Sequence, residues 1–245
     1  LQSCTKLSQR LFKKLPATHR QNKLFFESSF GPFLSRKGRK IFAQLFSKSW
    51  KVLLLTRKEN IKMIDLLDLH KMFILRHLHE GDTAVDFTMG NGHDTEFLSK
   101  TVGENGHVFA FDIQEQAVES TRANLAKAGC PENYTLILDS HHNVEKYVRE
   151  PIKAGMFNLG YLPGGDKKIT TMRETTMPAI KSALGLLGAD AVLMIAVYPG
   201  HAEGDAEGKM IDEYLSTLNR HVYCAAKVQI VNSPTSPYFF MIETK

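Results

Sequence analysis

The chain has 245 residues, of which 43% are hydrophobic, and this is enough for one well-packed core. No apolar run approaches the roughly 20 residues that a membrane-spanning helix needs, so we expect no membrane association. The net charge of +5 is uneven: residues 1–60 hold 14 Lys/Arg and 2 acids, a net of +12, while the remainder holds 17 Lys/Arg and 24 acids, a net of −7. The high pI therefore belongs to the N-terminal segment and indicates no nucleic-acid footprint of the rest.

Residues 1–62 form a basic segment, which we expect to be disordered or not natively translated. An acid-poor basic N-terminus can be an organelle transit peptide or a nucleic-acid-binding arm. A third interpretation, that translation begins at Met63 and the preceding residues are read-through of upstream sequence, is favoured for two reasons. The chain begins with Leu, and Arg57, Lys58 and Glu59 can be encoded by AGA-AAG-GAG, which contains a ribosome-binding sequence. Met63 then lies at a plausible spacing for a bacterial start codon. The codons of residues 57–59 in the gene test this hypothesis.

Apolar residues recur at helical spacing over residues 64–78, which predicts a helix before the first strand. Three histidines lie in or near this helix, but no cysteine or acid cluster completes a metal site, so no metal ligand is predicted. Cys4, Cys130 and Cys224 are scattered without metal or redox spacing. This usage of cysteine fits a reducing compartment.

The stretch from Thr83 to Phe97 predicts a buried strand, a glycine turn and the start of a helix. Gly90 and Gly92 allow a sharp turn and a close approach of a ligand. Asp94 and Thr95 fall where caps are favoured at a helix start. A strand that runs through a glycine turn into a helix is the nucleotide-binding corner of an open α/β sheet.

The composition of this turn indicates which ligand it takes. The third glycine of a dinucleotide site is absent, and the pattern is D-x-T-x-G-x-G-x-D, beginning at Asp86 and Thr88. Acids repel a pyrophosphate and suit a cationic ligand with an amino acid group, such as S-adenosylmethionine. A dinucleotide site and a loop without a ligand are the alternatives.

The second predicted strand, Val108–Phe111, ends at Asp112, about twenty residues past the glycines. This is the distance expected of a carboxylate that holds a ribose diol. A helix over residues 114–128 follows and ends at a glycine.

The third predicted strand, Tyr134–Leu138, ends at the same edge of the sheet, where ligands bind. Asp139, Ser140 or His141 could contact the adenine ring. For Asp139 and Ser140, a cap on a helix over residues 144–148 is the alternative.

A short strand, Gly155–Phe157, delivers the loop 158–167, which is rich in Gly, Pro and polar residues. A loop of this kind after a central strand indicates function. Asn158 and Tyr161 keep the N-x-x-Y spacing of enzymes that methylate amino groups. The oxygen of an Asn side chain can hold the hydrogens of an amine and aim its lone pair, and a Tyr ring can stack on a base. A structural turn is the alternative.

The side chains after these positions offer proton acceptors and cations. An alkylamine is mostly protonated at pH 7 and must lose a proton, which Asp166, His201 or a water could accept. Lys167, Lys168 and Arg173 could meet phosphates. The alternatives are a plain turn histidine and a solvated helix start.

The C-terminal part predicts a helix over residues 171–187, a strand over 191–197 and a helix over 203–218. Two strands over residues 222–231 and 237–243 then form an antiparallel hairpin. Such a hairpin after five α/β units is typical of methyltransferases. The predicted fold is α/β, a class I methyltransferase (Rossmann-like) doubly wound sheet with a C-terminal antiparallel hairpin.

The motifs DFTMGNGHDTEFL, FAFDIQ, DSHHN, FNLGYLPGGDK and YPGH occur in this order. Together they resemble the bacterial tRNA 5-aminomethyl-2-thiouridine methyltransferase family, long labelled rRNA methylases. The resemblance covers residues 63–245, the predicted methyltransferase domain, and NLGYLPGGDK is its most specific part. It implies methyl transfer from S-adenosylmethionine to the aminomethyl group of the wobble uridine in certain tRNAs.

The resemblance also implies roles for single residues. Asn91, His93 and Asp94 would line the methionine end, Gln114 would join Asp112 at ribose and adenine, and Asn158 and Tyr161 would sit at the transferred methyl. The predicted cofactor-binding residues are Asp86, Thr88, Gly90, Asn91, Gly92, His93, Asp94, Thr95, Asp112, Gln114, Ser140 and His141. The predicted catalytic residues are Asn158, Tyr161, Asp166 and His201, and the predicted RNA contacts are Lys167, Lys168, Arg173 and Tyr198.

The expected partner is tRNA at its anticodon region, with a homodimer as one form of assembly. The expected location is the bacterial cytoplasm, or an organelle if residues 1–62 are a transit peptide. The alternatives in function are an amine methyltransferase for rRNA or a small metabolite, and a non-catalytic protein that binds S-adenosylmethionine or RNA.

Overall fold

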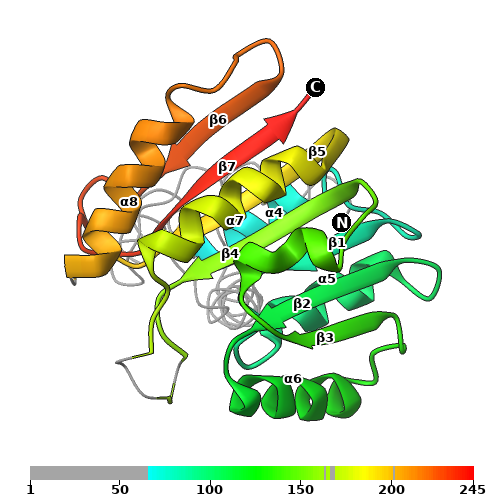
Figure 1. Cartoon of the computed structure of the whole chain (residues 1–245). Helices are drawn as coiled ribbons and strands as arrows, with labels where there is room; N and C mark the ends of the chain where they lie inside the picture. The colour runs from blue at the N-terminus through cyan, green and yellow to red at the C-terminus, as the bar shows by residue number, and fades with distance from the viewer. Residues whose placement is uncertain (1–65, 163, 166–168, 201) are drawn as a thin grey trace, which may run out of the picture. The chain divides into compact units, whose positions relative to one another are not determined.

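A computed structural model describes residues 66–245 apart from 163, 166–168 and 201 (Figure 1). These residues belong to one compact unit, Ile64–Lys245. The basic segment 1–62 and the predicted domain boundary after it lie outside the described residues, so both stay predictions. In the described part of the chain, no helix is long and apolar enough to cross a membrane, and no three His, Cys, Asp or Glu side chains gather as a metal site would require.

Seven strands form one sheet in the order β3-β2-β1-β4-β5-β7-β6. The first five strands are parallel, and β7 runs antiparallel to both β5 and β6. This arrangement confirms the predicted doubly wound sheet with its C-terminal antiparallel hairpin. The strands are β1 (Thr83–Asp86), β2 (His107–Asp112), β3 (Tyr134–Leu138), β4 (Ile152–Leu159), β5 (Leu187–Val197), β6 (Tyr223–Val228) and β7 (Tyr238–Thr244).

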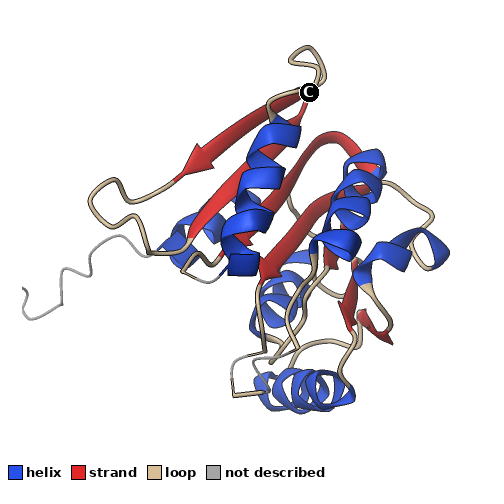
Figure 2. Ribbon diagram, turned by 60° about the vertical axis from the view of Figure 1, so that its left-hand side comes forward, coloured by secondary structure: helices blue, strands red, loops and turns tan. Residues whose placement is uncertain are grey.

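Helices cover both faces of this sheet (Figure 2). One face packs against a 3-10 helix and two α-helices, which are η2 (His141–Lys146), α7 (Arg173–Leu186) and α8 (Ala202–Leu215). The other face packs against α4 (Leu66–Ile74) and α5 (His93–Val102), and α6 (Glu115–Ala128) lies beside α5. Each face therefore has its own buried cluster of apolar side chains.

The two central strands extend further than the sequence predicts. β4 was expected over residues 155–157 but runs over Ile152–Leu159. Its start was missed because Lys153 interrupts the apolar run. The structure accommodates this charge by placing Lys153 Nζ 2.9 Å from the carbonyl oxygen of Ala189. β5 begins at Leu187, directly after α7, without the expected turn at Gly188. Strands buried on both faces read as continuous apolar runs, and the charged interruption concealed the length of β4.

The helix before the first strand is anchored by His77, which lies just beyond the end of α4. Its Nδ1 lies 2.9 Å from a carboxylate oxygen of Asp190, and its Nε2 lies 3.0 Å from one of Glu243. Asp190 is near the start of β5, and Glu243 is near the end of β7. One buried side chain therefore ties the end of α4 to two strands of the sheet.

Candidate active site

The order of the strands reverses between β1 and β4, and the carboxyl ends of both strands lie at the same edge of the sheet. Ligands of open α/β sheets bind at such a switch point. A cavity of about 650 Å³ lies there. The predicted residues that line it are Thr88, Gly90, Asp112, Gln114, Ser140 and His141 on the cofactor side, and Asn158, Tyr161 and Tyr198 on the other.

The glycine turn is closed by Asp112. The backbone N–H of Gly90 donates to Asp112 Oδ2 at 3.1 Å, and the N–H of Gln114 donates to Oδ1 at 3.0 Å. Gly90 has φ +51° and Gly92 has φ +81°, and a Cβ on Gly92 would lie 2.9 Å from the Cα of Thr121. Only glycine fits this turn without strain. Partial burial raises the pKa of Asp112, and the backbone N–H groups oppose that shift.

Asp86 and Thr95 brace the turn from inside and do not line the cavity. Asp86 is fully buried, its Oδ1 accepts the N–H of Thr88 at 3.1 Å, and its Oδ2 accepts the hydroxyl of Thr95 at 2.7 Å. Burial first, and then the nearby charge of Asp94, raises the pKa of Asp86 to about 7. The acid that opens the motif is therefore a structural support of the turn.

Three further predicted cofactor residues lie next to the cavity without lining it. The Oδ1 of Asn91 accepts a hydrogen bond from Ser120, and His93 is exposed. Asp94 pairs with Lys71, with Nζ and Oδ1 separated by 3.0 Å. Contacts of Asn91, His93 and Asp94 with a cofactor stay predictions.

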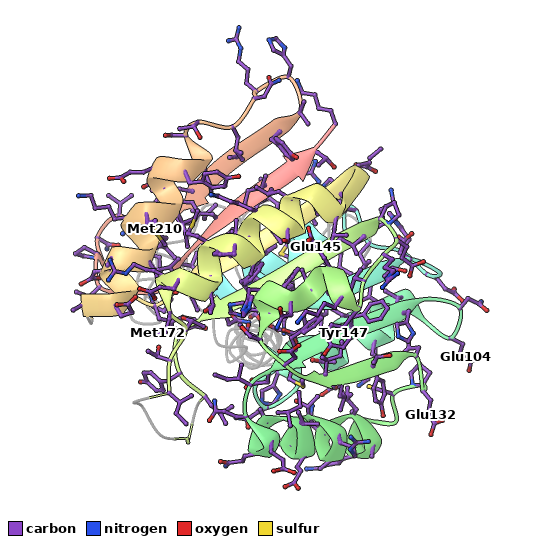
Figure 3. All side chains as sticks on the ribbon, viewed as in Figure 1. Glu104, Glu132, Glu145, Tyr147, Met172 and Met210 are labelled. Carbon is purple, nitrogen blue, oxygen red and sulfur yellow. The ribbon has the colours of Figure 1, made fainter. Side chains whose placement is uncertain are left out.

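After β3, Asp139 orders the turn into η2. Its carboxylate accepts from the N–H of Ser140, the side-chain amide of Asn143 and the hydroxyl of Tyr147 at 2.7, 2.9 and 3.0 Å. None of these bonds caps a backbone N–H of η2, and Asp139 also lines the cavity, so its contact with the adenine ring stays a prediction. Tyr147, labelled in Figure 3, could not be predicted from the sequence, because a single Tyr after a short helix follows no distinctive pattern.

His141 is buried beneath the cavity. Its Nδ1 lies 3.2 Å from the carbonyl of Phe87, and because a carbonyl only accepts, Nδ1 must donate. Burial lowers the pKa of His141 to about 4, so the ring is neutral at pH 7. Its Nε2 is buried and accepts no hydrogen bond from any described residue.

At the other end of the cavity, Asn158 is fixed at two points. Its backbone N–H donates to Thr88 Oγ1 at 2.7 Å, and its Nδ2 donates to Asp94 Oδ2 at 2.7 Å. Its Oδ1 accepts no hydrogen bond from a described residue and is not enclosed. An oxygen acceptor is thus available on a residue that lines the cavity.

The loop after Asn158 leaves the sheet and returns to α7 (Figure 1). Tyr161 forms an isolated antiparallel bridge with Thr170, and the N–H of Thr171 donates to the carbonyl of Gly160 at 3.0 Å. The predicted Asp166, Lys167, Lys168 and His201 lie outside the described residues. Their roles stay predictions.

Arg173 stands at the start of α7, where its Nε donates to Glu203 Oε1 at 2.9 Å. This ion pair offsets the positive charge of Arg173, for which a phosphate contact was predicted. Met172, labelled in Figure 3, and Ile169 line the cavity with about two fifths of their surface exposed, and Ile113 lines it on the cofactor side. Sequence analysis missed these three because single apolar residues in turns follow no periodicity.

The arrangement fits S-adenosylmethionine. The carboxylate of Asp112 and a glycine turn border one side of a cavity that also has apolar walls at Phe111 and Ile113. A carboxylate suits the ribose hydroxyls, and apolar walls suit the adenine ring. Asn158 lies in the same cavity, at the end of β4.

Comparison with known proteins places this chain. Residues 108–243 match the family model described as "Putative rRNA methylase". The chain belongs to this family. A crystal structure of a "putative rRNA-methylase" from Clostridium thermocellum is 38% identical, with a TM-score of 0.73, over 76% of this chain and 100% of that one. The resemblance inferred from the motifs is thereby confirmed.

Three further proteins are similar to this chain in sequence or in fold. A crystal structure described as "a putative methyltransferase" from Streptococcus mutans in complex with SAH is 38% identical, with a TM-score of 0.68, over 75% of this chain and 100% of that one. The tRNA (mnm(5)s(2)U34)-methyltransferase, chloroplastic, from Arabidopsis thaliana is 37% identical over 65% of this chain, which spans 62% of that relative. An O-methyltransferase from Streptomyces achromogenes in complex with SAM, at 13% identity and a TM-score of 0.58, shows the fold alone. The predicted cofactor class, S-adenosylmethionine, is confirmed by the methyltransferase relatives.

Proposed function

We propose that this chain is an S-adenosylmethionine-dependent N-methyltransferase that converts the 5-aminomethyl group of the wobble (2-thio)uridine in tRNA to 5-methylaminomethyl. The observation that carries this proposal is Asn158: its side-chain nitrogen is committed to Asp94, and its oxygen is left to accept in the cavity. An amine has hydrogens for such an acceptor to hold, whereas a carbon nucleophile has none. The choice of substrate is supported by the Arabidopsis relative, whose name specifies the methylated nucleoside mnm(5)s(2)U34 of tRNA.

The residues of the cavity divide the work. Asp112 would hold the ribose hydroxyls, and Gly90 allows the backbone to lie close to the cofactor. S-adenosylmethionine, when bound, supplies an electrophilic methyl group. Asn158 Oδ1 would accept a hydrogen bond from the substrate amine and so turn the lone pair of the amine nitrogen toward that methyl group. Because only the neutral amine carries a lone pair, the protonated amine must give up a proton before this attack, and Asp166, His201 and water are the proposed acceptors.

RNA is proposed as the partner because of the shape and chemistry of the rim. Tyr161, Ile169 and Met172 are each about two fifths exposed at the mouth of the cavity, and Tyr198 lines it. Aromatic and apolar side chains of this kind stack on unpaired bases. Phosphate contacts are proposed for Lys167 and Lys168, while Arg173 is already paired with Glu203.

A second candidate substrate is an amine in rRNA, because the family is described as an rRNA methylase family. The same acceptor and the same rim would serve it. The test below therefore includes both RNAs.

The location in the cell is also a proposal. The Arabidopsis relative is described as chloroplastic, and the basic, acid-poor residues 1–62 have the composition of a transit peptide. This supports the organelle alternative beside the bacterial cytoplasm. Fusion of residues 1–62 to a fluorescent protein in plant cells would show import into an organelle if the alternative holds, and diffuse fluorescence if it does not.

Mass spectrometry of nucleosides tests the reaction. The full chain is incubated with S-adenosylmethionine and with tRNA that carries unmethylated 5-aminomethyl-2-thiouridine, and in parallel with rRNA and a small alkylamine. We expect a gain of one methyl on the wobble nucleoside, and a loss of this gain in Asn158→Ala with unchanged affinity for SAH. Methylation of rRNA alone would move the proposal to the second candidate. Cofactor binding without methylation of any substrate would overturn it.

A further inference from the structure

Three side chains from three different elements form a chain of polar contacts behind the cavity. Lys71 in α4 places its Nζ 3.0 Å from Asp94 Oδ1, and Asp94 in α5 accepts the Asn158 Nδ2 at 2.7 Å through its other oxygen. Lys71 also lies over the ring of Phe97, with its Nζ 5.3 Å from the ring centre. The Lys71 and Asp94 side chains are 30% and 14% exposed, so both are largely withdrawn from solvent.

The contacts from Lys71 to Asp94 and from Asp94 to Asn158 fix the orientation of the Asn158 side-chain amide. A carboxylate paired with a lysine can only accept hydrogen bonds, so it must meet the amide nitrogen and not the amide oxygen. The backbone of Asn158 cannot turn to compensate, because its N–H is held by Thr88 Oγ1 at 2.7 Å. The amide oxygen is consequently the side-chain atom left for a ligand in the cavity.

We propose that Lys71 and Asp94 are positioning residues for methyl transfer: the lysine holds the carboxylate, and the carboxylate holds the Asn158 amide with its oxygen toward the substrate amine. The inference rests on the proposed function, since it assumes that this oxygen acts on an amine. A charge-assisted hydrogen bond to the amide nitrogen also draws electron density toward the amide oxygen, which makes it a better acceptor.

Lys71 does not line the cavity, so it acts only through Asp94. Its charge is needed there because Asp94 lies near the fully buried Asp86, whose own acidity it already perturbs. Among the described residues, Lys71 is the cation in salt-bridge contact with Asp94. Its loss would leave the Asp94 carboxylate without its ion pair and free to rotate away from Asn158.

The chain supplies a matched control. Lys100 pairs with Glu96 at 2.7 Å, and the other Glu96 oxygen accepts the Asn124 side-chain amide at 2.9 Å. This is the same sequence of lysine, carboxylate and asparagine, on α5 and α6, but its asparagine does not line the cavity. Lys100→Met therefore removes a more exposed ion pair of the same kind, whose asparagine also donates to the Gly92 carbonyl but does not hold Asn158.

The first readout is independent of activity. The side-chain amide signals of Asn158 are followed by ¹⁵N NMR in the SAH-bound protein and assigned by their absence in Asn158→Ala. We expect Lys71→Met to shift these signals and to speed the exchange of their hydrogens with water, Lys71→Arg to restore them, and Lys100→Met to leave them in place. Unmoved Asn158 signals in Lys71→Met would overturn the inference.

The second readout is kinetic. We expect Lys71→Met to lower kcat by roughly ten- to a hundredfold, the range that a misplaced orienting group costs, with KM for the RNA and Kd for SAH within about twofold of wild type. Lys71→Arg should recover most of kcat, and Lys100→Met should retain it. A normal kcat in Lys71→Met, or an equal loss in Lys100→Met, would overturn the inference.

The two readouts separate this inference from the proposed function. If the wild-type protein methylates no amine, the proposed function fails and the kinetic role fails with it, whatever the NMR result. If the wild-type protein methylates the wobble nucleoside while Asn158 does not respond to Lys71, the positioning role alone fails.

Discussion

At the scale of single residues, Asp86 is the carboxylate whose surroundings conflict most with its charge. It is fully buried, and its pKa is raised to about 7 from 3.8. A group whose folded pKa is raised contributes stability that is fully present below the unfolded pKa, near 4, and is lost as the pH rises through about 7. His141, whose pKa is lowered to about 4, acts in the opposite sense: its contribution is present above pH 6.5 and is lost as the pH falls through about 4.

Asp86→Asn should therefore change how stability depends on pH. Asparagine keeps an acceptor for the Thr88 N–H and carries no charge to bury. Relative to wild type, we expect the variant to gain on the order of a few kcal/mol in free energy of unfolding between pH 4 and pH 8. Urea unfolding of both proteins at both pH values measures the free energy of unfolding. The contribution of His141 is the same in both proteins, so it cancels in the difference between variant and wild type. Parallel pH profiles would contradict the assignment.

Asp112 is the residue on which cofactor affinity should depend most. Its carboxylate holds the glycine turn and would hold the ribose, so Asp112→Ala should weaken binding of SAH by roughly 1.5–3 kcal/mol. Asp112→Asn keeps one acceptor oxygen, so its affinity for SAH should lie between that of wild type and that of Asp112→Ala. Isothermal titration calorimetry measures the affinity, with Asp212→Ala, a surface carboxylate paired with Lys227, as the control. An affinity of Asp112→Ala within twofold of wild type would exclude this role.

At the scale of elements, the active-site loop is held to α8 by a buried carboxylate. Glu207 is fully buried and accepts the hydroxyls of Thr171 and Thr176 at 2.9 and 2.6 Å. The bonds join the returning end of the loop and the first turn of α7 to a third element. The rim of the cavity is therefore fixed from below by α8.

Thr176→Val tests this attachment with little change of shape. It removes a hydrogen bond to a fully buried side chain, so we expect a loss of roughly 1–3 kcal/mol in free energy of unfolding. Thr175→Val is the matched control, because among the described residues the Thr175 hydroxyl donates to the carbonyl of Met172 nearby, in a solvent-exposed hydrogen bond. Equal losses in the two variants by chemical denaturation would show that Glu207 does not hold the loop.

The elements also show what the sequence could predict and what it could not. The order and type of the elements follow from periodicity and turn residues, and β3 over Tyr134–Leu138 agrees to the residue. The length of β4 was hidden by Lys153, whose charge reaches a carbonyl outside the strand. At the site, Asp112 was predictable because its spacing from the glycines is fixed by one βαβ unit.

The contacts that sequence reasoning missed join residues with no fixed spacing. Glu207 reads as part of the polar face of a helix, yet it is buried because two threonines from another element meet it. Lys71 reads as a solvated helix residue, and its partner Asp94 belongs to a different helix. Such pairs depend on tertiary packing, which periodicity does not describe.

At the scale of the whole molecule, α4 is attached to the sheet by His77 as well as by its apolar face. His77→Ala removes contacts with Asp190 and Glu243, and we expect a loss of roughly 1–3 kcal/mol in free energy of unfolding. His221→Ala, at an exposed position, should change it by less than about 0.5 kcal/mol. Thermal unfolding of the three proteins measures both. A His77→Ala protein as stable as wild type would show that α4 is seated by its apolar contacts alone.

The attachment of α4 sets a limit on how far the chain can be shortened from its N-terminus. Every strand of the sheet and every residue that lines the cavity lies after residue 80. A protein that begins after residue 80 would keep every residue that lines the cavity but would lose Lys71 and His77. Such a truncation should still retain SAH while turning over its substrate slowly, which would separate possession of a methyl donor from competence to use it.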